Sequence, residues 1–143
     1  MKAQLSQRWE IFIDGACHGN PGEAAVGVVV RSNGYVIKSL SQAIGRATNN
    51  IAEYTALIYA LQEALIHRAD PVWVHTDSAL LYHQIRGDYK VKDPGLKSLW
   101  AQAQHLVKGF RGFEIQYIPR EKNKEADRLA TQAILKNRSL KRV

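Results

Sequence analysis

Three runs of apolar and β-branched residues follow one another at the start of the chain, before any helical pattern appears. They cover residues 9–14, 25–31 and 35–43. Between the last two runs stand Asn33 and Gly34, a pair that readily supplies the positive φ angles of a tight hairpin turn. Strands connected this closely pair in antiparallel fashion. The chain is therefore expected to begin with a three-stranded antiparallel sheet.

The remaining chain alternates helical and strand patterns. Helical periodicity covers residues 51–67, 78–86, 94–107 and 123–136, and short apolar strands are expected at 72–76 and 113–118. Asp70 and Pro71 are expected to break the first helix, Gly87 is expected to end the second, and Asn123 is expected to cap the last. This order of elements predicts an α/β fold, with a mixed five-stranded sheet and helices packed on its faces.

The length and charge of the chain bound its class. Its 143 residues suit a single domain, 1–143, with a core at about 9–136 and a basic tail at 137–143 that is expected to fray. The net charge of +7 favours a polyanionic partner, first of all nucleic acid. A basic protein without such a partner would carry the same charge, so this feature alone leaves both readings open.

Cysteine usage and hydropathy indicate the compartment. Cys17 is the only cysteine, which excludes an intramolecular disulfide and a cysteine-rich zinc site and fits a reducing compartment. The N-terminal segment has no apolar core of a signal peptide, and no apolar run approaches the ~20 residues that span a bilayer. We therefore expect a cytoplasmic protein that does not enter a membrane.

Glu53 occupies an unusual place for a carboxylate. The helix positions that share its face are all apolar: Ala56, Leu57, Ala60, Leu61 and Ala64. Glu53 thus continues a stripe that faces the core, where an unpaired carboxylate is costly. It is expected to have a partner or a bound metal. The alternative is a glutamate that interacts with the free N–H groups of the first helical turn.

Three aspartates stand at comparable positions. Asp14 and Asp77 each follow an apolar strand, and ligand sites of open α/β sheets gather beyond the carboxyl ends of strands. Asp127 lies one turn into the last helix, on a mostly apolar face. Each also has a structural explanation, in a glycine-rich turn, a helix cap and a helix N-terminus respectively.

Taken together, the four carboxylates indicate a metal site. If the first and fourth strands are neighbours, Asp14 and Asp77 lie side by side, and a divalent cation is the usual remedy for the repulsion between them. Oxygen ligands alone favour Mg²⁺ or Mn²⁺ over zinc. Two such ions about 3.5–4 Å apart form the usual clamp for in-line attack on a phosphodiester.

Four segments of the chain, in order, resemble the type 1 ribonuclease H family. They are IFIDGACHGNPGEAAVGVVV, TNNIAEYTALIYAL, HTDSALLYHQI and PREKNKEADRLA, which together reach from about residue 9 to residue 134. The resemblance implies a ribonuclease H fold with the strand order 3-2-1-4-5. It also implies an endonuclease that hydrolyses the RNA strand of RNA–DNA hybrids with two Mg²⁺ ions, or Mn²⁺ as a substitute, and leaves 5′-phosphate and 3′-hydroxyl ends. We expect a monomer with no obligate protein partner.

The resemblance also implies roles for individual residues. The catalytic, metal-binding carboxylates of the family correspond to Asp14, Glu53, Asp77 and Asp127. Positions that contact the minor groove and the RNA 2′-hydroxyls correspond to Asn20, Asn49, Ser78 and the backbone near Cys17, and a pocket for a DNA-strand phosphate corresponds to Arg46 and Thr48. Reading 2′-hydroxyls is how a protein distinguishes RNA from DNA. The structural alternatives are a helix cap for Asn49, a turn for Asn20 and a surface charge for Arg46.

The chain departs from the family in two places. Many members carry a histidine in the loop before the last carboxylate, whereas residues 119–124 contain none, and Arg120 or Glu121 are the candidates for part of its role. Many members also have a long basic insertion rich in tryptophan, of which only residues 87–96 remain. Lys90 and Lys92 are candidates for phosphate contacts in this short form, with a solvated loop as the alternative.

Two other functions compete with this interpretation. A hybrid-binding module without catalysis would gain nothing from carboxylates that face phosphates. A Holliday-junction resolvase or a 3′–5′ exonuclease also uses carboxylates, but the segments DGACHGNPG and TNNIAEY do not resemble their patterns. The sequence therefore favours a metal-dependent ribonuclease.

Overall fold

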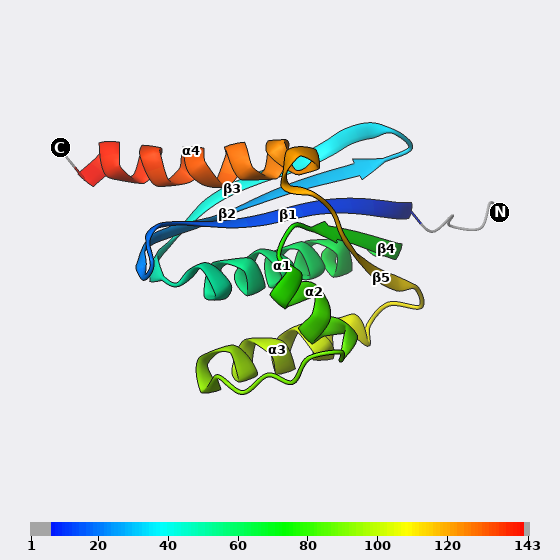
Figure 1. Ribbon diagram of the computed structural model, residues 1–143. Coiled ribbons are helices and arrows are strands. Elements are labelled where there is room, and N and C mark those ends of the chain that lie inside the picture. Colours follow the sequence, from blue (N-terminus) through cyan, green and yellow to red (C-terminus); the bar gives the residue numbers. More distant parts are fainter. Residues whose placement is uncertain (1–6, 142–143) are drawn as a thin grey trace.

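The structure, a computed structural model, describes residues 7–141 of the chain and has a mixed five-stranded sheet at its centre (Figure 1). Its elements are β1 (Gln7–Gly19), β2 (Gly22–Ser32), β3 (Tyr35–Ala47), α1 (Asn49–Ile66), β4 (Ala69–Thr76), α2 (Ala79–Arg86), α3 (Pro94–Val107), β5 (Phe113–Tyr117), a 3₁₀ turn (Arg120–Lys122) and α4 (Lys124–Lys141). The strand order is β3-β2-β1-β4-β5, antiparallel among the first three strands and parallel from β1 to β4 to β5. The predicted fold class and strand order are confirmed.

Helices cover both faces of the sheet. α4 lies along β1, β2 and β3 on one face, whereas α1 lies on the other face with α3 packed outside it (Figure 1). The apolar stripe that continues Glu53 is buried as predicted, and it packs in one core with alternate residues of β1 and β2. Among the described residues, no helix combines the length and the apolar character that crossing a membrane requires.

Two glycines let the helices approach the strands closely beside Asp14. A Cβ atom on Gly15 would lie 2.4 Å from the carbonyl carbon of Ala52 in α1. Gly27, which pairs with Asp14 across β1 and β2, would bring a Cβ atom within 2.0 Å of the carbonyl oxygen of Ala126 in α4. Only glycine allows such an approach of backbones. The residue that follows each of these alanines is one of the predicted carboxylates, so the two close approaches deliver them to Asp14.

The connection between α1 and β4 differs from the prediction. α1 ends at Ile66, Arg68 adopts a φ of 56°, and Asp70 and Pro71 lie inside β4. The prediction that these two residues break the helix is therefore wrong. The carboxylate of Asp70 instead accepts hydrogen bonds of 2.9 and 3.0 Å from the backbone N–H groups of two residues just before β5.

The C-terminal part of the chain is more helical than predicted. The expected loop at 119–122 contains the 3₁₀ turn Arg120–Lys122. α4 continues to Lys141, so the predicted fraying tail is wrong for residues 137–141, and residues 142–143 lie outside the described part. Nε of Arg138 donates a 3.0 Å hydrogen bond to Glu23 in β2, which fixes the last turns of α4.

Candidate active site

Asp14 and Asp77 lie at the point where β1 and β4 separate. The last pair of the parallel register joins Ile13 to Thr76. Asp14 is the next residue of β1, and Asp77 is the first residue after β4. β1 then continues to Gly19 paired only with β2, so Asp14 lies within the strand and not at the predicted strand end. The parallel pairing nevertheless places the two carboxylates next to each other, as the sequence indicated.

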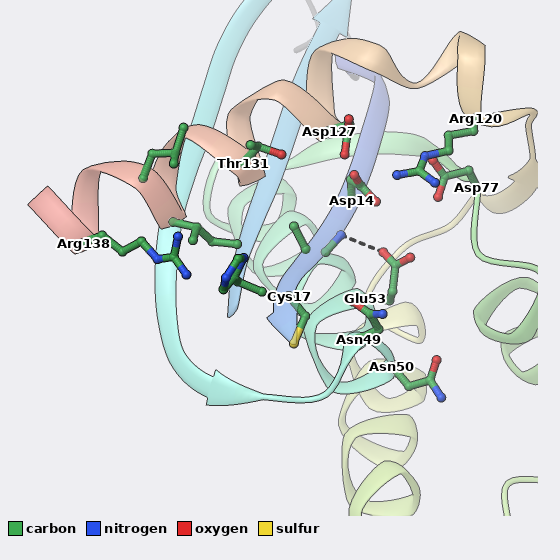
Figure 2. Close-up of a pocket in the computed structure, with 15 residues that line it drawn as sticks. Asp14, Cys17, Asn49, Asn50, Glu53, Asp77, Arg120, Asp127, Thr131 and Arg138 are labelled. Carbon is green, nitrogen blue, oxygen red and sulfur yellow. Dashed lines mark hydrogen bonds between the residues drawn. The ribbon is translucent and has the colours of Figure 1, made fainter. Parts of the chain in front are cut away.

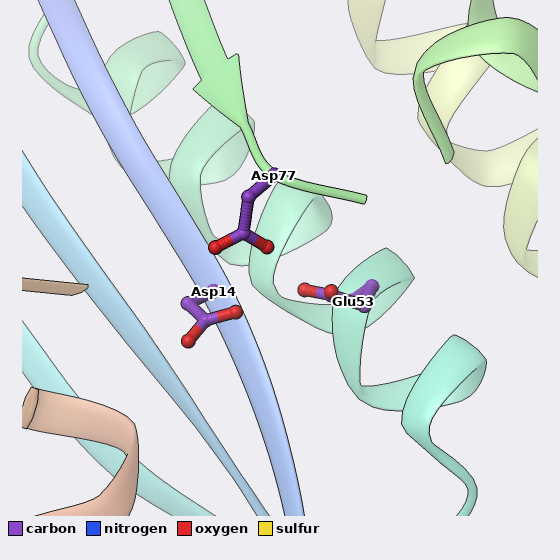
Figure 3. A group of neighbouring side chains, drawn as sticks. All are labelled: Asp14, Glu53 and Asp77. Atoms are coloured by element: carbon purple, nitrogen blue, oxygen red, sulfur yellow. The ribbon is translucent and has the colours of Figure 1, made fainter. Parts of the chain in front are cut away.

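Glu53 completes a compact group of three carboxylates (Figure 3). Asp14, Glu53 and Asp77 each contribute an oxygen, and these oxygens lie within 4.8 Å of one another. Glu53 accepts a 2.7 Å hydrogen bond from the backbone N–H of Gly15, which directs its side chain toward β1 (Figure 2). The N–H group that it binds belongs to a strand and not to the first turn of its own helix. Glu53 is thus part of the site and not a helix-terminal charge.

Asp127 joins this group from α4. It lines the same hollow of about 510 Å³ as the other three carboxylates (Figure 2). A side-chain hydrogen bond with Asp127 contributes to raising the pKa of Asp14. The structure thus brings together all four predicted carboxylates, which we call the carboxylate group: Asp14, Glu53, Asp77 and Asp127.

The carboxylate group is hard to ionise completely. Burial, followed by the charges of Glu53 and Asp77, raises the pKa of Asp14 to about 9. Burial and then the charge of Asp77 raise the pKa of Glu53 to about 8. Burial also raises the pKa of Asp77, against the opposing effects of a hydrogen bond from Asn123 and the charge of Arg120. A divalent cation would relieve this repulsion, and an all-oxygen donor set fits Mg²⁺ or Mn²⁺.

Asn123 connects the segments that carry three of these carboxylates. Its Nδ2 donates hydrogen bonds of 2.8 Å to the carbonyl of Ile13 and 3.3 Å to Asp77. Its own carbonyl accepts a 3.1 Å hydrogen bond from the N–H of Asp127. Asn123 precedes α4 as predicted, but the predicted side-chain cap is wrong, because its Oδ1 is buried without a hydrogen-bond partner in the described structure. The amide holds the site together instead.

Arg120 brings a positive charge to the edge of the carboxylate group. It lines the hollow, its guanidinium lies beside Asp77 in Figure 2, and its charge lowers the pKa of Asp77. Glu121, the other predicted auxiliary residue, is exposed and is not among the residues that line the hollow. Of the two candidates for the role of the absent loop histidine, Arg120 is the one that lies at the hollow.

Some predicted nucleic-acid contacts lie at the same hollow. Cys17 and Asn49 line it. Asn20 lies beside it, because its Oδ1 accepts a 3.1 Å hydrogen bond from the N–H of Asn49. The thiol of Cys17 donates to the carbonyl of Ala47 at 2.9 Å. The first of these bonds joins the β1–β2 turn to the start of α1, and the second joins β1 to the end of β3.

The other predicted contacts have structural partners or lie elsewhere. Thr48 and Ser78 each accept a 3.2 Å hydrogen bond from an N–H in the first turn of α1 and α2, and so cap these helices. Arg46 is exposed at the end of β3. Lys90 and Lys92 are exposed in the connection between α2 and α3, and neither lines the hollow.

The hollow also includes residues that the sequence did not indicate. Among them are His18, Thr131 and Arg138. Thr131 and Arg138 follow Asp127 by four and eleven residues, which places all three on one face of a helix. Thr131 already lies within the predicted helix 123–136, whereas placing Arg138 on this face needed the helix to extend beyond residue 136.

Comparisons with known proteins agree with this geometry. The family model described as "Reverse transcriptase-like" matches residues 12–133. The bifunctional protein Rv2228c of Mycobacterium tuberculosis is 45% identical over 87% of this chain. The crystal structure of RNase H1 from Halobacterium salinarum superposes with a TM-score of 0.87 at 41% identity and covers 89% of this chain and 97% of that chain. LC11-RNase H1 in complex with an RNA/DNA hybrid superposes with a TM-score of 0.86 at 39% identity, over 90% of this chain and 98% of that one.

The five-stranded sheet and its acidic hollow define a protein of the ribonuclease H-like fold class. Identity of 41% over 89% of the chain narrows the assignment, and the chain belongs to the type 1 ribonuclease H family. The chain matches only part of the length of some relatives: 35% of the Mycobacterium protein and 64% of the ribonuclease HI of Halobacterium salinarum.

Proposed function

We propose that this protein is a metal-dependent endonuclease that hydrolyses the RNA strand of RNA–DNA hybrids. The observation that carries the proposal is the approach of carboxylate oxygens from Asp14, Glu53 and Asp77 to within 4.8 Å of one another. Membership of a family that includes an enzyme solved in complex with an RNA/DNA hybrid supports the choice of substrate.

The proposed cofactor is a pair of Mg²⁺ ions, for which Mn²⁺ can substitute. The carboxylate group would hold both ions. When bound, the two ions supply a water of lowered pKa for attack and positive charge for the leaving oxygen. Attack of water on phosphorus would break the bond between phosphorus and the ribose 3′-oxygen, which would take up a proton, so the products would carry 5′-phosphate and 3′-hydroxyl ends.

The chain itself orients the reacting groups. The N–H of Gly15 and the amide of Asn123 hold Glu53 and Asp77 in place, which prepares the site before the substrate arrives. The guanidinium of Arg120 stands beside Asp77, where it can pair with a phosphate oxygen of the cleaved strand. These contacts prepare both the ligands and the charge balance of the site.

Selection of an RNA–DNA hybrid needs contacts with both strands. We assign the reading of ribose 2′-hydroxyls and the minor groove to Asn20, Asn49, Ser78 and the backbone at Cys17, three of which lie at the hollow or beside it. We assign the binding of DNA-strand phosphates to Arg46 and Thr48, with further phosphate contacts from Lys90 and Lys92.

We further propose that the protein acts as a monomer in the cytoplasm, without an obligate protein partner. Cys17 is a free thiol, which supports a reducing compartment. Light scattering of the purified protein at micromolar concentration should give the mass of one chain, and a dimer would contradict the proposal.

A hybrid with blocked RNA ends tests the proposed function. With Mg²⁺, the RNA strand should be cut internally, the DNA strand should stay intact, and the fragments should carry 5′-phosphates. The variant Asp14→Asn should cut nothing. Binding without cutting would favour a non-catalytic module, cutting only at free ends would favour an exonuclease, and no cutting with either Mg²⁺ or Mn²⁺ would refute the proposal.

A further inference from the structure

The hollow that contains the carboxylate group extends along α4 to an arginine. Asp127 lies across the hollow from Asp14, and Arg138 lies farther along α4 (Figure 2). The α4 residues that line the hollow after Asp127 lie on one face of the helix: Thr131, Ile134, Leu135 and Arg138. Asp127 and Arg138 are separated by about 16 Å along the helix axis, since an α-helix rises 1.5 Å per residue. The charged side chain of Arg138 is therefore well beyond any atom that the carboxylate group could touch.

Arg138 is held in a defined position and is not a loose surface charge. Its Nε donates a 3.0 Å hydrogen bond to Oε1 of Glu23, and the two side chains are 35% and 33% exposed. This bond uses one of the five N–H donors of the guanidinium, and the other four are on its terminal nitrogens. A fixed, half-buried guanidinium in a polar hollow is suited to bind a phosphate through two parallel hydrogen bonds.

We propose that Arg138 binds a backbone phosphate of the cleaved strand, away from the scissile bond. The proposal rests on the proposed function, because the scissile phosphate must lie at the carboxylate group. From there the hollow leads along α4, past the hydroxyl of Thr131 and the apolar side chains of Ile134 and Leu135, to Arg138. A strand that follows this path presents its next phosphates to a cation instead of to carboxylates. A strand in a duplex carries one phosphate per 3.4 Å of axis, so the contacted phosphate lies within about five steps of the cut.

α4 supplies a matched control for this site. Arg128 is on the same helix, is exposed and pairs with Glu125, but it does not line the hollow. Its charge contributes only to the general positive field. Arg138→Ala and Arg128→Ala therefore remove the same charge from the same helix, and only the first removes the proposed ligand of the phosphate.

The first experiment measures steady-state cleavage of a short hybrid over a range of salt concentrations. Arg138→Ala should raise KM by about 3–10-fold with kcat within about twofold of wild type, and should reduce the slope of log KM against log salt by about one. Arg128→Ala should change KM by less than about twofold. Equal effects of the two variants would overturn the proposal.

Glu23→Gln separates phosphate binding from a structural tie between α4 and β2. If Arg138 only ties the two elements, both variants should raise KM and lower Tm, and Glu23→Gln should do so less, because the glutamine carbonyl can still accept the bond from Nε. If Arg138 binds phosphate, Glu23→Gln should leave KM unchanged or lower it, because the carboxylate no longer competes for the guanidinium. A rise in KM with Glu23→Gln, together with a lower Tm, would overturn the proposal.

Single uncharged methylphosphonate linkages then locate the phosphate. At one linkage of the cleaved strand, the methylphosphonate should weaken hybrid binding by wild type and by Arg128→Ala. The same replacement should not weaken binding by Arg138→Ala, which already lacks the contact with that phosphate. Equal sensitivity of all three proteins at every linkage, or coupling that falls on the uncut strand, would contradict the assignment. A wild-type protein that cuts no hybrid would refute the proposed function itself, which is a different outcome from failure of the Arg138 site.

Discussion

The carboxylate group and the connection between α2 and α3 are both proposed to contact the substrate, but the surrounding structure holds their side chains very differently. Asp14 is 6% exposed and lies where two paired strands diverge, and a glycine N–H and a buried asparagine hold its neighbours. Lys90 and Lys92, by contrast, are exposed in residues 87–93, which form neither helix nor strand. We call this segment the lysine loop.

The difference indicates a division of labour. Groups that must meet a reacting phosphate within a fraction of an ångström need rigid supports and fixed neighbours. Charges that only attract a polyanion act at longer range and tolerate motion. Changes in the carboxylate group should therefore affect kcat, and changes in the lysine loop should affect KM and its dependence on salt.

The largest effect is expected from Asp77→Asn. Loss of one carboxylate removes a proposed metal ligand that no other residue replaces, and kcat should fall by more than about 10³-fold. Asp88→Asn is the matched control. Asp88 is an exposed aspartate in the lysine loop, and it pairs with His83 and Arg86 at the end of α2. Its turnover should stay within about twofold of wild type. Single-turnover cleavage at saturating enzyme measures both, and substantial cleavage by Asp77→Asn would show that the carboxylate is dispensable.

A smaller loss is expected from Asn123→Ala. The side-chain amide fixes the backbone before Asp14 and one oxygen of Asp77, so its removal should lower kcat by about 10–100-fold and weaken Mg²⁺ binding. KM for the hybrid should change little, because Asn123 is only 1% exposed and its amide is therefore out of reach of the substrate. A merely structural role would lower Tm while leaving kcat and the Mg²⁺ requirement of the folded protein unchanged, and that result would contradict the account.

The double change Lys90→Ala and Lys92→Ala should have the opposite signature. We expect KM to rise several-fold, the slope of log KM against log salt to fall by about two, and kcat to remain near that of wild type. The charge-conserving double change to arginine should restore most of the affinity. Loss of kcat with an unchanged salt slope would place the lysine loop in the chemistry and break the proposed division.

The smallest expected effect is on stability and depends on pH. Asp14 and Glu53 have folded pKa values of about 9 and about 8, above their ordinary values of 3.8 and 4.5. The unfolded chain therefore releases these protons at lower pH than the folded chain, and metal-free stability falls as pH rises from about 4 to about 9.

The variant Asp14→Asn removes part of this loss. Without metal, its Tm should exceed that of wild type by about 2–5 °C at pH 7, and the difference should vanish near pH 4. Thermal unfolding monitored by circular dichroism in chelator measures the difference. A lower Tm for the variant at pH 7 would mean that Asp14 is stabilised as an anion by groups other than a metal.

The parts of the molecule that the sequence predicted are those specified by local periodicity. Alternation in the first three strands and the apolar face behind Glu53 both report which side of an element is buried, and that burial predicted the direction of the Glu53 carboxylate. The approach of Asp14 and Asp77 followed from the adjacency of two strands. Each of these inferences needed only the pattern within an element and one assumption about pairing. The strand order came from the resemblance to the ribonuclease H family.

The predictions that were wrong concern side chains with distant partners. Asp70 binds backbone groups 41 and 42 residues away, Asn123 binds a carbonyl 110 residues away, and Arg138 binds a carboxylate 115 residues away. A turn-forming or capping residue chooses between its local backbone and such a partner according to the assembled fold. No periodicity in the sequence contains that information, so these residues were assigned to a helix break, a helix cap and a fraying tail.

Mg²⁺ binding measured by isothermal titration calorimetry tests the central claim most directly. Asp14 and Glu53 hold protons at pH 7 because burial raises their pKa values to about 9 and about 8, and a cation must displace those protons. Titration of Mg²⁺ in two buffers of different ionisation enthalpy should therefore show release of roughly one to two protons per protein, and Asp14→Asn should show less. Binding of Mg²⁺ with no proton release, or equal binding and release by the variant, would contradict the assignment of the carboxylate group as the metal site.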